Sequence, residues 1–167
     1  MRLVILGAGG YGRTVFDLAE QSGRYERILF LDDNSPLAAG KCAEYAAFLD
    51  EDTEFYPAFG NNAGRLDWLE RLKDAGARIM ALVHPTAYVS PRAEIGEGCV
   101  VLPKAVVNTD TRVERGCIIN CGAIIDHGCV VGEGAHICLG AIVKAENNIP
   151  PRMKVEAGEV IENRTFR

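Results

Sequence analysis

The feature that most constrains this chain is a six-residue repeat in its C-terminal half. Every sixth position is Val or Ile: Val89, Ile95, Val101, Val107, Val113, Ile119, Ile125, Val131, Ile137, Val143, Ile149 and Val155. Two residues before the first ten of these stands a small residue: Ala87, Ala93, Cys99, Ala105, Thr111, Cys117, Ala123, Cys129, Ala135 and Ala141. A short period repeated this often is the signature of stacked, nearly identical structural units.

The physical interpretation of each six-residue unit is a short strand followed by a turn. Two inward positions separated by one outward position define a strand, and glycines often occupy the turn positions, at Gly96, Gly98, Gly116, Gly128, Gly132 and Gly134. An α-helix would need a period of 3.6 residues, which this segment lacks. Three units close one triangular coil, and stacked coils pair in parallel. The repeat therefore predicts a left-handed parallel β-helix of about four coils.

Composition narrows the class of protein. The 167 residues carry a net charge of −5 and about half of them are apolar, which favours a folded protein and argues against nucleic acid as a partner. No apolar run approaches the roughly 20 residues of a membrane span, so we expect a cytoplasmic protein. The six cysteines form no CxxC pair, and disulfides are rare in a reducing cytosol. We expect Cys99, Cys117 and Cys129 to be small buried side chains of the repeat.

The first 83 residues predict a small α/β domain. Apolar strands are expected at 3–6, 28–31, 55–59 and 78–83, with helical segments at about 13–21, 41–49 and 63–75. Alternating strands and helices favour a parallel, Rossmann-like sheet. The fold class is therefore α/β plus all-β, with a domain boundary at His84-Pro85, giving domains 1–83 and 84–167.

Glycine-rich and polar residues follow the predicted strands. Gly7, Gly9 and Gly12 match G-x-G-x-x-G, and Asp32 lies 20 residues beyond Gly12. Since only half of a dinucleotide fold fits this domain, a nucleoside diphosphate suits the helix N-terminus better than NAD. Alternatively, Asp32-Asp33 is an ordinary turn, and Gly60-Asn61-Asn62 is a strand-to-helix turn with an asparagine N-cap.

Together these segments resemble one family along nearly the whole chain. The matching segments, in order, are GAGGYGR (7–13), FLDD (30–33), AFGNNAGR (58–65), HPTAYVSPRAEIGEG (84–98) and the DHG of the repeat array (126–128). They are similar to the bacterial sugar O- and N-acetyltransferases of the sialic-acid O-acetyltransferase type. Within that family they most resemble the branch that N-acetylates nucleotide-linked 4-amino sugars.

The resemblance implies a homotrimer that transfers acetyl from acetyl-CoA to a UDP-linked amino sugar. It implies that His127 is the catalytic base, with Asp126 as its acidic partner. The residues implied at the UDP-sugar are Gly10, Tyr11, Gly12, Arg13, Asp32, Asp33, Gly60, Asn61, Asn62 and Arg65. Those implied at acetyl-CoA, which would lie between neighbouring subunits, are Asn120, His136 and Gly140. No metal is implied.

The residue types suit the chemistry. An attacking amine must lose a proton, and a histidine can accept it near neutral pH. Two departures from the family affect the donor side: Gly128 follows His127 where the family usually has an acidic residue, and the repeat array is short.

Two other functions stay open. The first is a binding module that holds a nucleotide sugar without transferring acetyl. The second is a zinc enzyme resembling the γ-type carbonic anhydrases, although Gly122 stands where a zinc-binding histidine would be expected. Each of His84, His127 and His136 could also be purely structural.

Apolar outward positions predict self-association. The outward residues Val100, Val106, Ile118, Ile124 and Val130 would form exposed stripes that need a partner. We expect the α/β domain and the 156–167 tail to cap the two ends of the β-helix.

Overall fold

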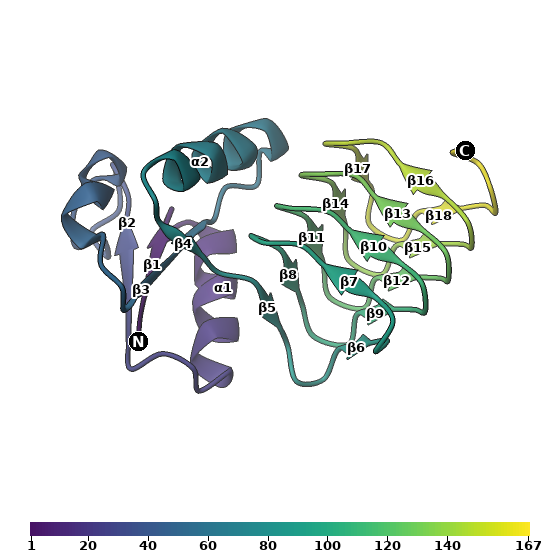
Figure 1. The fold of residues 1–167 in the computed structure, drawn as a ribbon, viewed down its shortest axis with the longest axis horizontal. Helices are drawn as coiled ribbons and strands as arrows, with labels where there is room; N and C mark the ends of the chain where they lie inside the picture. Colours follow the sequence, from purple (N-terminus) through teal and green to yellow (C-terminus); the bar gives the residue numbers. More distant parts are fainter. The chain divides into compact units, whose positions relative to one another are not determined.

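The structure, a computed structural model, describes all 167 residues and confirms the predicted fold class: a small α/β domain followed by a left-handed parallel β-helix (Figure 1). The chain divides into two compact units, Met1–Met80 and Ala81–Arg167. No helix is long and apolar enough to cross a membrane.

The first unit is a four-stranded parallel sheet with the order β2-β1-β3-β4. Its strands are β1 (Arg2–Leu6), β2 (Arg27–Leu31), β3 (Thr53–Pro57) and β4 (Arg78–Ile79). The helices are α1 (Gly10–Gln21) and α2 (Asn62–Asp74), with a 3₁₀ segment η1 (Cys42–Phe48). Helix α1 packs on β1 and β2, and α2 packs on β3 and β4. The predicted apolar face of α2 is confirmed, since Leu66, Leu69 and Leu72 are buried.

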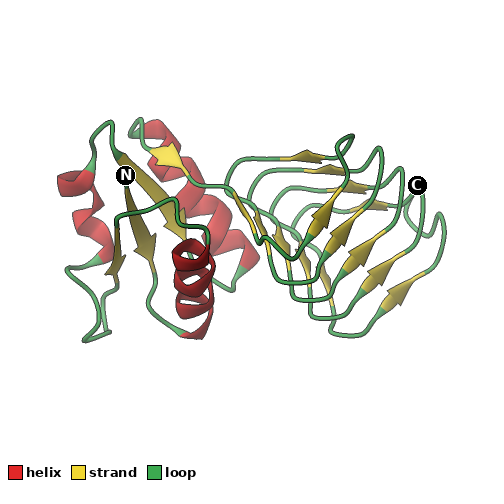
Figure 2. Cartoon of the chain, turned by 90° about the horizontal axis from the view of Figure 1, so that it is seen from below, coloured by secondary structure: helices red, strands yellow, loops and turns green.

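The second unit consists of two-residue strands that recur every six residues. They are β5 (Leu82–Val83), β6 (Tyr88–Val89), β7 (Glu94–Ile95), β8 (Val100–Val101), β9 (Val106–Val107), β10 (Arg112–Val113), β11 (Ile118–Ile119), β12 (Ile124–Ile125), β13 (Val130–Val131), β14 (His136–Ile137), β15 (Ile142–Val143), β16 (Asn148–Ile149), β17 (Lys154–Val155) and β18 (Val160–Ile161). They form three parallel sheets, with the orders β16-β13-β10-β7, β17-β14-β11-β8-β5 and β18-β15-β12-β9-β6 (Figure 2). Residues 18 apart therefore stack on successive coils.

The interior of the β-helix matches the predicted pattern. From Val101 to Val155 the sixth-position residues are buried, as are the small residues from Cys99 onward. The three interior thiols of Cys99, Cys117 and Cys129 each donate to a backbone carbonyl of the next coil. All six cysteines are free. These contacts explain why a small residue with a weak donor fits the position.

The boundary between the two units lies three residues earlier than the sequence predicted. The expected strand 78–83 is two separate strands: β4 ends at Ile79, whereas Leu82–Val83 pairs with Val100–Val101 of the β-helix. The prediction of one continuous strand was wrong because Val83 stands six residues before Val89, with the small Ala81 two residues before it, and so belongs to the six-residue repeat. The β-helix accordingly has between four and five coils, with β5 and β18 extending the array at its two ends.

Residues 156–167 were expected only to cap the β-helix, but they also continue it. Strand β18 lies within this segment and extends one sheet of the β-helix. Beyond it, Phe166 packs against the core of the β-helix. The buried amide of Asn147 binds this end: its Nδ2 donates to the carbonyls of Lys144 and Glu162, and its Oδ1 accepts from the Phe166 N–H.

The prediction of exposed outward stripes is correct for one sheet only. Val100 and Ile118 are fully buried, whereas Val106 and Val130 are half-buried and Ile124 is 40% exposed. The outer face of the β18-β15-β12-β9-β6 sheet is apolar on every strand: Tyr88, Val106, Ile124, Ile142 and Val160.

Candidate functional site

The polar loops of the N-terminal unit lie at one edge of its sheet. The strands are parallel, so the loops after β1, β2 and β3 leave from the same carboxyl edge. In the order β2-β1-β3-β4 the chain adds β2 on one side of β1 and β3 on the other, so the strand order reverses between β1 and β3. Open α/β sheets bind their ligands at such a point. The glycine loop after β1 touches the loop after β3, since a Cβ on Gly7 would lie 3.1 Å from the Ala58 carbonyl oxygen.

The glycine loop passes directly into helix α1. The helix begins at Gly10, three residues before the predicted start, so Gly10, Tyr11, Gly12 and Arg13 all lie in its first turn. A Cβ on Gly12 would lie 2.0 Å from the Gly7 carbonyl oxygen, so only glycine fits there. A Cβ on Gly10 would have no neighbour within 4 Å, and the N-terminal N–H groups of a helix suit a phosphate.

Asp32 holds the glycine loop in place. Its carboxylate accepts hydrogen bonds from the backbone N–H groups of Ala8 and Asn34, each at 2.8 Å. These bonds lower the pKa of Asp32, and the bond from the Ala8 N–H has the largest effect. The exposed Asp33 accepts from the Cys42 N–H at 3.1 Å. Both residues of the predicted pair therefore shape the loop.

The loop after β3 is organised by its own side chains. Asn61 caps α2 by accepting from the Gly64 N–H at 2.8 Å, as the alternative N-cap interpretation expected. Arg65 is fully buried and donates to the Phe59 carbonyl and to Asn62 Oδ1, each at 2.9 Å. Arg65 thus fixes the loop from beneath, while Gly60 and Asn61 stay exposed.

Two further predicted residues reach the same edge from α1. The Tyr11 hydroxyl is 2.5 Å from the hydroxyl of Tyr56, a fully buried residue of β3 that the sequence did not single out. Arg13 is exposed one residue after Gly12.

In the β-helix unit, His127 and Asp126 form a pair at a coil corner. His127 Nδ1 lies 3.1 Å from Asp126 Oδ1, which also accepts from the His127 backbone N–H at 2.7 Å. Asn108, one coil earlier, donates to the same oxygen at 3.1 Å. The His127 side chain is 52% exposed. This arrangement suits an imidazole that keeps a proton on Nδ1 and accepts another on Nε2.

A cavity of about 280 Å³ adjoins this pair. It is lined by His127, Ala145, Glu146, Asn163 and Arg164. Of these residues, only His127 was predicted from the sequence. The others could have been found by the repeat, because adding 18 and 36 to the corner residues 127 and 128 gives 145, 146, 163 and 164.

Asn120 and His136 form a second pair, on the sheet of β11 and β14. Asn120 Nδ2 lies 3.0 Å from His136 Nε2, and Asn120 Oδ1 accepts from the Cys121 N–H at 2.8 Å. Gly140 follows at a corner with a left-handed backbone (φ 62°), where a Cβ would have no neighbour within 4 Å. The corner one coil earlier, at Gly122, is equally open.

The two pairs belong to different corners of the β-helix. Strand β12, with its exposed Ile124, separates Asn120 from Asp126 along the chain. The apolar sheet described above therefore runs between the two pairs.

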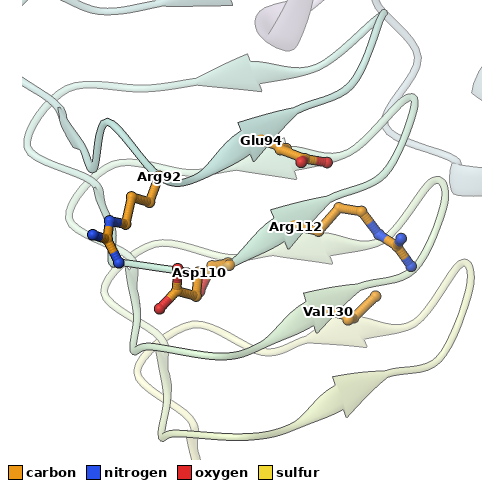
Figure 3. Close-up of a pocket in the computed structure, with 6 residues that line it drawn as sticks. Arg92, Glu94, Asp110, Arg112 and Val130 are labelled. Carbon is orange, nitrogen blue, oxygen red and sulfur yellow. The ribbon is translucent and has the colours of Figure 1, made fainter.

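Other polar groups of the β-helix have structural partners. The buried His84 bonds Thr86 through Nδ1, both to its hydroxyl at 2.9 Å and to its N–H at 3.1 Å. No group of three or more His, Cys, Asp or Glu side chains is placed to hold a metal ion. A cavity of about 370 Å³ on the β7-β10-β13 face is lined by Arg92, Glu94, Asp110, Thr111, Arg112 and Val130, none of them a predicted site residue (Figure 3).

The fold and its two polar pairs define a hexapeptide-repeat protein with a Rossmann-like N-terminal domain. A family model described as the PglD N-terminal domain matches residues 2–72. The acetyltransferase domain of PglB from Neisseria gonorrhoeae FA1090 is 31% identical, with a TM-score of 0.88 over 97% of this chain and 91% of that one. The chain belongs to the bacterial sugar N-acetyltransferase family of hexapeptide-repeat proteins, which confirms the resemblance drawn from the sequence.

Two other relatives extend the comparison. The UDP-N-acetylbacillosamine N-acetyltransferase of Bacillus subtilis (strain 168) is 31% identical over 109 residues, 60% of this chain. That match spans half the length of the Bacillus protein. PerB from Caulobacter crescentus, solved in complex with CoA and GDP-perosamine, shares the fold with a TM-score of 0.80 over 98% of this chain and 89% of that one, at 23% identity.

Proposed function

We propose that this protein is an acetyl-CoA-dependent N-acetyltransferase acting on a nucleotide-linked amino sugar, with His127 as the general base. The observation that supports it most strongly is the bond between His127 Nδ1 and Asp126, because it orients an exposed imidazole within a family of acetyltransferases. The PglB domain has also been solved with acetyl coenzyme A, at 32% identity and a TM-score of 0.85.

The proposed reaction is direct transfer. The sugar amine attacks the thioester carbonyl, and its proton passes to His127 Nε2. The tetrahedral intermediate then collapses to the amide, and the proton leaves with the CoA thiolate. Asp126 keeps Nδ1 protonated and stabilises the imidazolium that forms, as a carboxylate does beside a catalytic histidine. No covalent enzyme intermediate is needed.

The proposal assigns the nucleotide diphosphate to the N-terminal unit. The glycine loop and the first turn of α1 offer N–H groups to the phosphates. Arg13, Asp33, Gly60 and Asn61 are exposed at this edge and can face the ligand, whereas Asp32 and Arg65 hold the loops. Relatives act on or bind both UDP-linked and GDP-linked sugars, so both nucleotides belong in the test.

The proposal assigns acetyl-CoA to the corner of Asn120, His136 and Gly140. The open space around Gly122 and Gly140 lets a thin chain approach the backbone closely, and Asn120 and His136 offer polar groups beside it. Because His127 lies across the apolar sheet from that corner, we further propose a homotrimer in which sites form between neighbouring subunits. We also propose that the protein works in the cytoplasm, since both substrates are cytoplasmic metabolites.

The test is acetyl transfer to UDP- and GDP-linked 4-amino sugars, followed by mass spectrometry. Replacing His127 by Ala should lower kcat by about 10²–10⁴-fold, with a melting temperature close to that of the parent. Acetyl-CoA and the matching nucleotide should each raise the melting temperature, since each binds only the folded state. Protection by the nucleotide without protection by acetyl-CoA, and without transfer, would favour the binding module instead.

A further inference from the structure

The corner of His127 is built from residues that stack on successive coils. Backbone bonds connect these coils: Gly128 N donates to Thr109 O at 3.0 Å, Glu146 N to His127 O at 3.1 Å, and Arg164 N to Ala145 O at 3.3 Å. The residues of each coil thus have fixed neighbours 18 positions away. Glu146 stands one coil beyond Gly128, and Arg164 one coil beyond Glu146.

The stem of the Glu146 side chain lies beside Gly128, the residue that follows His127. Gly128 has no side chain to block it, and a Cβ there would lie 3.6 Å from Glu146 Cγ. Arg164 forms an ion pair with the Glu146 carboxylate through its Nε. His127, Glu146 and Arg164 all line the cavity of about 280 Å³. A carboxylate and its arginine therefore face the same cavity as the imidazole.

We propose that Glu146, held by Arg164, is a positioning residue for His127: it supplies, from the next coil, negative charge that favours the protonated imidazole. The inference rests on the proposed role of His127 as general base. In that role the imidazole gains a proton as the amine attacks, so a nearby anion stabilises the state formed during transfer.

The electrostatics of the corner agree with this assignment. Arg164, first by its hydrogen bond and then by its charge, holds the pKa of Glu146 below its usual range, and the charge of His127 acts in the same direction. Opposite charges that line one cavity attract, so an anionic Glu146 stabilises positive charge that develops on the imidazole.

Other charged groups face the same corner from the neighbouring coils. Asp126 bonds His127 directly, and the 18-residue register places Asp110 one coil before Gly128 and Lys144 one coil after Asp126. Lys144 is paired with Glu162 at 2.6 Å. Among these groups, Glu146 is the carboxylate that lines the cavity with His127.

The test is an NMR pH titration of the His127 imidazole in the full-length protein, which has only three histidines. Replacing Glu146 by Gln should move the midpoint of the His127 titration down by roughly half a pH unit, the size expected for a screened charge near the surface. Replacing Arg164 by Gln should move it up, because Glu146 then lacks its cation. The opposite signs distinguish charge effects from a general loss of structure.

A matched control exists at another corner of the same β-helix. Glu133 pairs with Arg115 at 2.8 Å, so Glu133→Gln removes one charge and one ion pair of the same kind. This variant should leave the His127 midpoint unchanged. In activity assays, the acid limb of the kcat/KM profile should shift with the midpoint in the Glu146 and Arg164 variants and stay in place in the control.

Two results would overturn the inference. The first is a titration midpoint of His127 that is the same in the Glu146 and Arg164 variants as in the Glu133 control. The other is a rise in KM for the nucleotide sugar with no change of midpoint, which would assign the pair to substrate binding. Since NMR reads His127 whether or not transfer occurs, shifted midpoints in a protein without activity would count against the proposed function and not against the electrostatic coupling.

Discussion

At the scale of the residue, several side chains that were predicted to contact the ligand instead hold the loops in place. The Asp32 carboxylate binds two backbone N–H groups, Asn61 caps α2, and Arg65 is buried beneath its loop. Buried or loop-bound polar groups of this kind fix the geometry in which exposed neighbours can act. The glycine loop is the clearest case, because it depends on the absence of side chains.

Replacing Gly12 by Ala should destabilise the protein by about 3 kcal/mol or more. The new Cβ would lie 2.0 Å from the Gly7 carbonyl oxygen, so either the loop or α1 must move. Urea unfolding measures the change. Gly10→Ala, where a Cβ has no neighbour within 4 Å, is the control and should change the stability by less than about 1 kcal/mol. Equal losses in both variants would contradict the prediction.

Replacing Asp32 by Asn should make the protein less sensitive to acid. The pKa of Asp32 is lowered in the folded state, chiefly by the hydrogen bond from Ala8. Its contribution to stability is therefore present above the unfolded pKa of about 3.9 and is lost as the pH falls through the lower folded pKa. Melting temperatures at pH 6, 4 and 3 should fall less in the variant than in the parent. Parallel curves would show that Asp32 is not coupled to folding.

At the scale of the element, the β-helix depends on its corners as much as on its strands. The corner positions Lys104, Gly122, Gly140 and Gly158 lie 18 residues apart and share a left-handed backbone, with φ between 60° and 70°. Glycine adopts this conformation without strain, whereas a side chain is disfavoured there by about 1–2 kcal/mol. The repeat therefore tolerates non-glycine residues at corners and loses some stability at each.

Opposite changes at two of these corners should have opposite effects. Gly122→Ala should destabilise the protein by about 1–2 kcal/mol, because the Ala must adopt the left-handed backbone. Lys104→Gly should stabilise it by about 0.5 kcal/mol, since relief of strain exceeds the extra freedom of glycine in the unfolded chain. Thermal or urea unfolding of the two variants checks the signs. Effects of the same sign would show that backbone conformation does not decide these positions.

At the scale of the whole molecule, the proposed assembly depends on one face of the β-helix. The outward residues of the β18-β15-β12-β9-β6 sheet are all apolar, and they are Tyr88, Val106, Ile124, Ile142 and Val160. The outward residues of the β16-β13-β10-β7 sheet include Glu94, Arg112 and Asn148. The apolar sheet is therefore the face that gains most from contact with another copy.

Replacing Ile124 by Glu should dissociate the proposed trimer. A charge at the centre of the apolar face would be buried without a partner on association. Sedimentation velocity should show a monomer where the parent sediments as a trimer, and the variant should also lose transfer activity. Val130→Glu, an outward position on the neighbouring sheet, should leave the assembly intact. A parent protein that sediments as a monomer would remove the basis for shared sites.

The sequence by itself determined the β-helix, because the repeat records at every sixth residue which side chains must be inside. It also predicted the Gly7–Gly12 loop, the helices and the pair of Asp126 and His127, because these are local features or matches to a family. The register of the repeat even contained Glu146 and Arg164, which lie 18 and 36 residues beyond Gly128.

Only the tertiary structure decided which outward side chains are buried and which polar groups are already satisfied. Val100 and Ile118 are buried although they face outward, and Arg65 is buried although it is charged. Burial and hydrogen bonding depend on residues distant in the sequence, so they appear only when the chain is folded.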